Sequence, residues 1–191
     1  MLDPIAWLEK NSAQRDVIDG LARFATDWPT LWNQCPRGDW LLGIALKLGV
    51  DHALAIRAAI GCAKVSADLV EGTPPIAQVF AQVLDAADRF ASGAANADEV
   101  ARLTTELERV MSAAVDPVTD AAARGALAVG LGVAEREVLA AAPAAAAEAQ
   151  MMSSIDCGHE MAMRWAHDKC AAAVRAAIPW SAIETCLTRL T

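Results

Sequence analysis

The chain has 191 residues, a length that suits one domain of ordinary size. It contains no tyrosine and only three phenylalanines, which argues against a β-sheet because strands favour aromatic and β-branched residues. Its formal net charge of −8 counts against a nucleic-acid partner, which would require a basic surface.

The sequence predicts a cytoplasmic protein that does not enter a membrane. Residues 1–4 lack the basic region and apolar core of a signal peptide. The uncharged stretch over residues 72–84 is too short to cross a bilayer. Five cysteines at scattered positions are typical of reduced, mostly buried thiols rather than of a disulfide framework.

Four short helices are expected in the first 50 residues. Asp3-Pro4 and Asp27-Trp28-Pro29 each place a carboxylate before a proline at the start of a helix. An apolar stripe over residues 17–25 predicts a helix between them. Asp39 is expected to cap a fourth helix that ends at Gly49. Helical spacing beside leucines predicts that the tryptophans of this region are core residues, namely Trp7, Trp28, Trp32 and Trp40.

The middle of the chain continues with longer helices. Asp51 is expected to cap a segment over residues 52–70, and an apolar stripe covers residues 76–90 before Gly93. Asn96 and Asp116-Pro117 mark two further helix starts.

The last third of the chain is rich in alanine, and its breaks are predicted from glycine and proline. Gly130-Leu131-Gly132 is expected to interrupt the chain, and Pro143 to kink or end the helix that follows. A long helix is expected over residues 154–178, and Ser181-Ala182-Ile183-Glu184 is the pattern of a capping box for a terminal helix.

These elements predict an all-α fold. Connections of two to six residues favour antiparallel neighbours, and hence one antiparallel helical bundle or helical array of about ten helices. We expect a single domain over residues 1–191, in which tryptophan-rich helices of residues 1–50 pack on an alanine-rich array of residues 51–191.

A cluster of potential metal ligands stands near the C-terminus. On a helix, His159, Met163, His167 and Cys170 would share one face, and imidazole and thiolate are ligands for zinc or copper. The spacing lacks a tight cysteine pair, and Met163 stands where a metalloprotease helix needs its second histidine. Core packing of a sulfur-rich face is therefore the favoured interpretation, and no metal or other cofactor is expected.

The sequence does not predict an enzyme. A nucleophilic cysteine or serine needs a base oriented by a third group, and the chain has three histidines in all. Gly130-Leu131-Gly132 lacks the third glycine and the preceding strand of a phosphate-binding loop.

From Trp32 onward the chain resembles a bacterial family of immunity proteins, the five-like class found near polymorphic toxins and in phage genomes. The segments that carry the likeness are Trp32-Asn33-Gln34-Cys35-Pro36-Arg37-Gly38-Asp39-Trp40-Leu41-Leu42 and Lys47-Leu48-Gly49-Val50-Asp51, followed by a helix bearing Cys62, an alanine-rich helical run and the segment 170–179. The resemblance implies an all-α fold and a cognate toxin as partner. The chain lacks the tyrosines common in the central helices of that family.

The leading functional hypothesis is therefore a protein that neutralises a cognate toxin by stoichiometric binding. Its acidic charge would steer a basic partner, and we expect contacts at carboxylates beside the predicted chain breaks, namely Asp116, Asp120, Glu135 and Glu137. Two alternatives stay open: a metal- or thiol-dependent helical protein that uses His159, His167 and Cys170, and a non-enzymatic scaffold protein.

Overall fold

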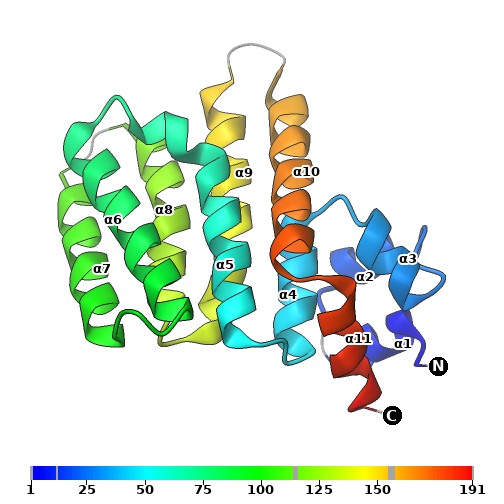
Figure 1. Ribbon diagram of the computed structural model, residues 1–191. Coiled ribbons are helices and arrows are strands. Elements are labelled where there is room, and N and C mark those ends of the chain that lie inside the picture. Colours follow the sequence, from blue (N-terminus) through cyan, green and yellow to red (C-terminus); the bar gives the residue numbers. More distant parts are fainter. Residues whose placement is uncertain (1, 12, 114–115, 155–157, 191) are drawn as a thin grey trace.

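The computed structural model describes residues 2–11, 13–113, 116–154 and 158–190 (Figure 1). Within these ranges the chain forms helices and no strand, which confirms the all-α prediction. The α-helices are α1 (Pro4–Lys10), α2 (Arg15–Leu21), α3 (Trp28–Gln34), α4 (Gly38–Lys47), α5 (His52–Ala63), α6 (Pro74–Ala91), α7 (Ala97–Met111), α8 (Pro117–Gly132), α9 (Ala141–Ser153), α10 (His159–Ala177) and α11 (Trp180–Thr188). Two short 3₁₀ helices, η1 (Lys64–Val70) and η2 (Arg136–Ala140), follow α5 and α8.

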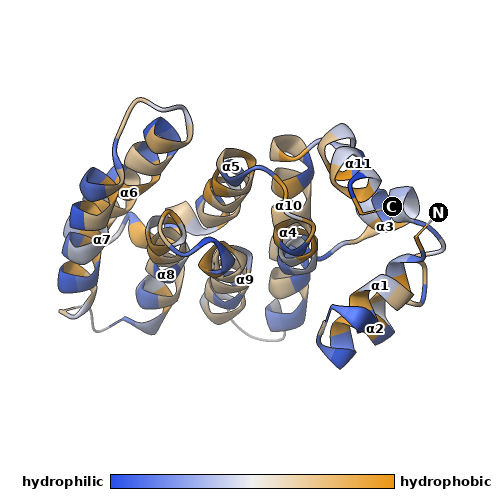
Figure 2. Cartoon of the chain, turned by 90° about the horizontal axis from the view of Figure 1, so that it is seen from below, coloured by the Kyte–Doolittle hydropathy of each residue, from blue (hydrophilic) through white to orange (hydrophobic). Residues whose placement is uncertain are grey.

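The long helices form an array of two layers (Figures 1 and 2). Helices α5, α6 and α10 pack against α4, α8 and α9, and α7 closes one edge against α6 and α8. At the other end of the array lie the short helices α1, α2, α3 and α11, which bring the two chain termini to the same side of the molecule. Hydrophilic residues gather on the outer surfaces, and apolar ones lie between the layers (Figure 2).

Small side chains let the central helices approach closely. Helix α8 buries five alanines and α9 another five, so the alanine-rich region is packed core and not a low-complexity tail. At Gly38 a side-chain carbon would overlap Cys170 and lie 2.8 Å from the backbone nitrogen of Ala171. At Gly61 it would lie 3.0 Å from the methyl group of Ala173. Helix α10 can therefore lie this close to α4 and α5 only because the residues at the contact carry a hydrogen atom or a methyl group.

The caps of several helices follow the sequence signals. The side chains of Asp3, Asp27, Asn96 and Asp116 each accept a backbone N–H bond at the start of a helix. Gly93 ends its segment with φ = +77°, a left-handed conformation that glycine adopts without strain. Gly49 has the same φ after α4.

The glycines near the end of α8 act in packing as well as at the predicted break. Helix α8 ends at Gly132 and η2 begins at Arg136, so the predicted interruption falls just after the two glycines. Side-chain carbons at Gly130 and Gly132 would overlap Thr104 and Leu139, so these positions also permit close packing. The prediction for Pro143 is wrong. Pro143 is the third residue of α9, where the missing N–H has no intrahelical partner to lose, so it neither kinks nor ends the helix.

Three other helix starts also differ from the prediction. Helix α4 begins at Gly38, which places Asp39 in its first turn with its carboxylate bound by Arg37 instead of capping. Helix α9 continues to Ser153, so the expected helix over residues 154–178 is α10, which begins at His159. Helix α11 begins directly after Pro179 without a side-chain cap, so the capping box does not form.

We expect the two glycines of α4 to respond oppositely to substitution. Gly38→Ala should lower the free energy of unfolding by about 1–3 kcal/mol, because the methyl group would overlap α10. Gly43→Ala should raise it by about 0.5–1 kcal/mol, because no atom lies within 4 Å and alanine favours helix. Urea unfolding measures both, and equal effects of the two substitutions would contradict the close approach of α4 and α10.

Candidate functional site

The four carboxylates expected to bind a partner do not form one cluster. Asp116 and Asp120 lie at the start of α8, whereas Glu135 and Glu137 follow its end. Helix α8 has sixteen residues and is roughly 24 Å long, so Asp116 just before its start lies far from Glu135 and Glu137 beyond its end. A small partner could therefore contact one pair without reaching the other.

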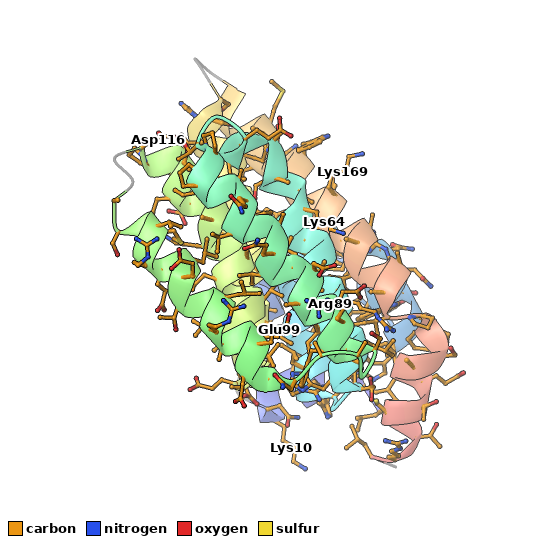
Figure 3. All side chains as sticks on the ribbon, turned by 60° about the vertical axis from the view of Figure 1, so that its left-hand side comes forward. Lys10, Lys64, Arg89, Glu99, Asp116 and Lys169 are labelled. Carbon is orange, nitrogen blue, oxygen red and sulfur yellow. The ribbon has the colours of Figure 1, made fainter. Side chains whose placement is uncertain are left out.

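Local contacts account for the first pair. The carboxylate of Asp116 accepts bonds from the hydroxyl and N–H of Thr119, which lower the pKa of Asp116. Asp120 pairs with Arg124, which also lies 3.6 Å from Glu148. Figure 3 shows Asp116 at the opposite end of the α7–α8 pair from Glu99, a residue bound by Arg89 across α6 and α7. Glu135 and Glu137 are exposed and have no ion pair among the described residues.

The proposed metal ligands are likewise separated. His159 is exposed, and its Nδ1 lies 2.8 Å from the carbonyl oxygen of Met151. His167 is buried about two turns further along α10, roughly 12 Å away, and Cys170 is buried about one turn beyond it. Across the described parts of the chain, no three His, Cys, Asp or Glu side chains come close enough to hold a metal ion.

Four of the five cysteines are free and buried, namely Cys35, Cys62, Cys170 and Cys186; Cys157 lies outside the described residues. The thiol of Cys62 lies 3.6 Å from the carbonyl oxygen of Cys170. In return, the thiol of Cys170 lies 3.9 Å from the carbonyl oxygen of Cys62. The neighbouring thiol and burial together raise the pKa of Cys62 well above its ordinary value. The thiol of Cys62 therefore stays protonated, and the contact between the two cysteines joins α5 and α10.

The segment around Trp40 joins the N-terminal helices to the array. Arg37 donates two bonds to the carboxylate of Asp39, at 2.9 and 2.6 Å, and its guanidinium lies 4.7 Å from the ring centre of Trp40. The Trp40 ring lies against Gly20 of α2, where any side chain would overlap it. Arg175 of α10 donates to the carbonyl oxygen of Cys35 at 2.9 Å. Three helices from distant parts of the chain therefore meet at this segment.

The tryptophans near the N-terminus are largely core residues, as predicted. Trp7, Trp28 and Trp32 are buried, and the rings of Trp7 and Trp28 make an edge-to-face contact with centres 5.4 Å apart. Trp40 is half-buried instead, because its outer edge faces a cleft of about 500 Å³ between α2 and α4.

This cleft carries charges of both signs. The charged residues that line it, beside Trp40, are Asp16, Arg37, Asp39 and Lys47. Most of these charges already have partners: Arg37 and Asp39 bind each other, and Lys47 donates to the carbonyl oxygen of Asn11. The cleft is therefore a junction between helices whose polar groups are largely satisfied internally.

His167 lies directly behind that junction. It is 7% exposed, and its Nδ1 lies 3.5 Å from a carboxylate oxygen of Asp39 without forming a hydrogen bond. Burial lowers the pKa of His167, and although Asp39 acts in the opposite direction, burial is the larger effect. The imidazole is therefore neutral at pH 7, and its contact with Asp39 is not an ion pair.

An exposed apolar patch lies elsewhere, on the outer side of the α9–α10 hairpin. Five large hydrophobic side chains are exposed among the described residues, and three of them lie at this hairpin: Met152, Met161 and Trp165. Met161 and Trp165 are one helical turn apart and are 71% and 48% exposed. Lys169 lies one turn further, 5.7 Å from the centre of the Trp165 ring. We call Met161 and Trp165 the α10 patch.

Sequence reasoning did not single out the α10 patch, although a signal was present. Ala166, Cys170 and Val174 form the buried stripe of α10, so Met161 and Trp165 fall on its opposite side. Large apolar residues opposite a buried stripe have no place in the core, and their position indicates a surface role.

Comparisons with known protein families, with curated proteins and with solved structures find no match to this chain. None of the described helices combines the length and apolar character needed to cross a bilayer.

Trp40→Ala should lower the free energy of unfolding by about 2–3 kcal/mol, less than truncation of a fully buried tryptophan would. The substitution removes contacts with Gly20 and Arg37 but leaves a site that already opens to solvent. Thermal or urea unfolding checks this value. A loss below about 0.5 kcal/mol, the usual range of a surface substitution, would show that the segment does not hold α2 in place.

Between pH 7.5 and 5.5 the free energy of unfolding should fall more in the wild type than in His167→Gln. The unfolded imidazole takes up a proton near pH 6.5, whereas the lowered pKa in the folded state resists protonation, so acidification favours unfolding. Urea unfolding across this range measures the difference. His52 and His159 are common to both proteins and cancel in the comparison; parallel profiles would contradict the neutral, buried state of His167.

Proposed function

We propose that this protein acts by stoichiometric binding of a protein partner, a basic toxin encoded beside it, and that the α10 patch is the contact surface. The observation that carries the proposal is the exposure of Met161 and Trp165 on a helix whose other side is fully packed. Tryptophan and methionine are enriched at protein interfaces, and a tryptophan at the centre of a contact often supplies much of the binding energy.

The surroundings of the patch suit a protein contact. Glu160, Arg164, Asp168 and Lys169 lie beside Met161 and Trp165 on α10 and carry equal numbers of positive and negative charges. An apolar centre with a charged rim is the usual anatomy of an interface. The helix is already ordered by its contacts with α9, α5 and α4, so binding would lose little conformational entropy.

Net charge supports a basic partner. The chain carries −8 overall, whereas the rim of the patch is balanced. The long-range field would accelerate encounter with a cationic protein, and the apolar contact would then hold the complex together. The resemblance of the Trp40 segment to immunity proteins supports the same class of partner.

The proposal predicts protection by co-expression. The wild-type protein should restore growth to cells that express the product of the adjacent gene, and the two proteins should co-purify at a ratio of one to one. Trp165→Ala should weaken binding about 10–100-fold, the range of an interface hot spot, while the melting temperature stays near that of the wild type. Calorimetric titration measures the affinity.

The matched control is Leu131→Ala, which truncates another exposed apolar side chain (42% exposed) in the last turn of α8. It should bind as the wild type does. Asp120→Lys and Glu137→Lys, made as separate variants, test whether either end of α8 contributes to binding of the partner. Failure of the wild type to protect or to co-purify would refute the proposed function. Unchanged binding by Trp165→Ala would refute the α10 patch as its site.

A further inference from the structure

A second groove lies where the two ends of the chain meet. It has a volume of about 510 Å³ and is lined by residues from the start of α3, by residues of α11 and by Leu2. It lies at the end of the array that holds the short helices, whereas the α10 patch belongs to the α9–α10 hairpin. Its volume is that of a site for a small molecule.

The walls of the groove are apolar and partly aromatic. Two tryptophans, Trp28 and Trp180, line it together with Leu2, Pro29 and Leu187. Trp28 is 2% exposed and is fixed by its edge-to-face contact with Trp7, whereas Trp180 is half-buried. Indole faces carry negative electrostatic potential and attract cations, so an aromatic wall favours a positively charged ligand over a negative one.

Glu184 supplies the charge of the groove. It is the only charged residue among those that line it, and no basic side chain of the described residues forms an ion pair with its carboxylate. Glu184 lies one turn after Trp180 on α11, so both side chains project from the same side of that helix. An ammonium group in the groove would meet an aromatic ring and a carboxylate together.

Trp28 adds an independent observation. Its indole Nε1 is buried and has no hydrogen-bond partner in the described part of the chain. Buried donors without a partner are uncommon in folded proteins. A ligand with a hydrogen-bond acceptor or a π face within reach could supply the missing contact.

From the tryptophan walls, the lone carboxylate and the apolar lining, we infer that this groove binds small aromatic or aliphatic amines in their protonated form. The apolar part of the ligand lies against Trp28, Trp180 and Leu187, and its ammonium group pairs with Glu184 at the mouth. This inference does not depend on the proposed function, because the α10 patch shares no residue with the groove.

Three probes with the same ring and different end groups test the inference: phenethylamine, 2-phenylethanol and phenylacetate. Calorimetric titration at pH 7 should show the amine binding about tenfold more tightly than the alcohol, from combined cation–π and charge pairing, and phenylacetate binding more weakly than both. Glu184→Gln should reduce the preference for the amine over the alcohol to about threefold or less. Trp180→Leu should weaken binding of the amine by a factor similar to the loss of preference caused by Glu184→Gln.

Glu108→Gln is the matched control, since it removes one exposed carboxylate from α7, away from the groove. It should bind all three probes as the wild type does. Equal binding of amine and alcohol to the wild type, or an amine preference in Glu184→Gln that stays near the tenfold expected of the wild type, would overturn the inference. Absence of saturable binding by any probe at millimolar concentration would also overturn it.

Discussion

The close approach of α10 to α4 and α5 joins the last third of the chain to the first third. It brings Cys170 beside Cys62, a residue 108 positions earlier, and it depends on the absence of a side chain at Gly38. The same approach sets the position of His167 behind Asp39, since the two residues lie on the helices that meet there. Any change that separates these helices would therefore disturb the tryptophan-rich end and the array together.

The segment around Trp40 is explained largely by packing. Arg37 is committed to Asp39 and Trp40, Gly38 passes along the backbone of α10, and the carbonyl oxygen of Cys35 accepts from Arg175. Residues with so many internal contacts have little capacity left for a partner. Met161 and Trp165 are different, because both side chains stay exposed on the side of α10 opposite its buried stripe. Close packing and the proposed contact surface thus fall on separate parts of the molecule.

The all-helical fold and most helix starts could be predicted from the sequence, because capping residues act within one turn of the chain. Asp27 and Asn96 bond the N–H groups three residues ahead, so their role needs no tertiary context. The prediction for Pro143 is wrong because the effect of a proline depends on its place in the helix, whose first N–H groups have no intrahelical partner. The packing role of Gly130 and Gly132 could not be predicted, because it depends on Thr104 and Leu139, which lie against them. The predicted helix start at Asp116 and the predicted break at Gly130 already place Asp116 and Glu137 at opposite ends of one helix, so the separation of the four carboxylates follows from elements that the sequence predicts.

The alanine-rich pairing of α8 and α9 has a thermodynamic consequence. Each buried alanine removes only one methyl group from water, whereas a leucine would remove several carbons, so unfolding exposes less apolar surface per residue here than in a leucine-rich bundle. The heat-capacity change of unfolding scales with that surface. The stability curve should consequently be flatter than usual for a chain of this length, with the free energy of unfolding varying little over a broad range of temperature.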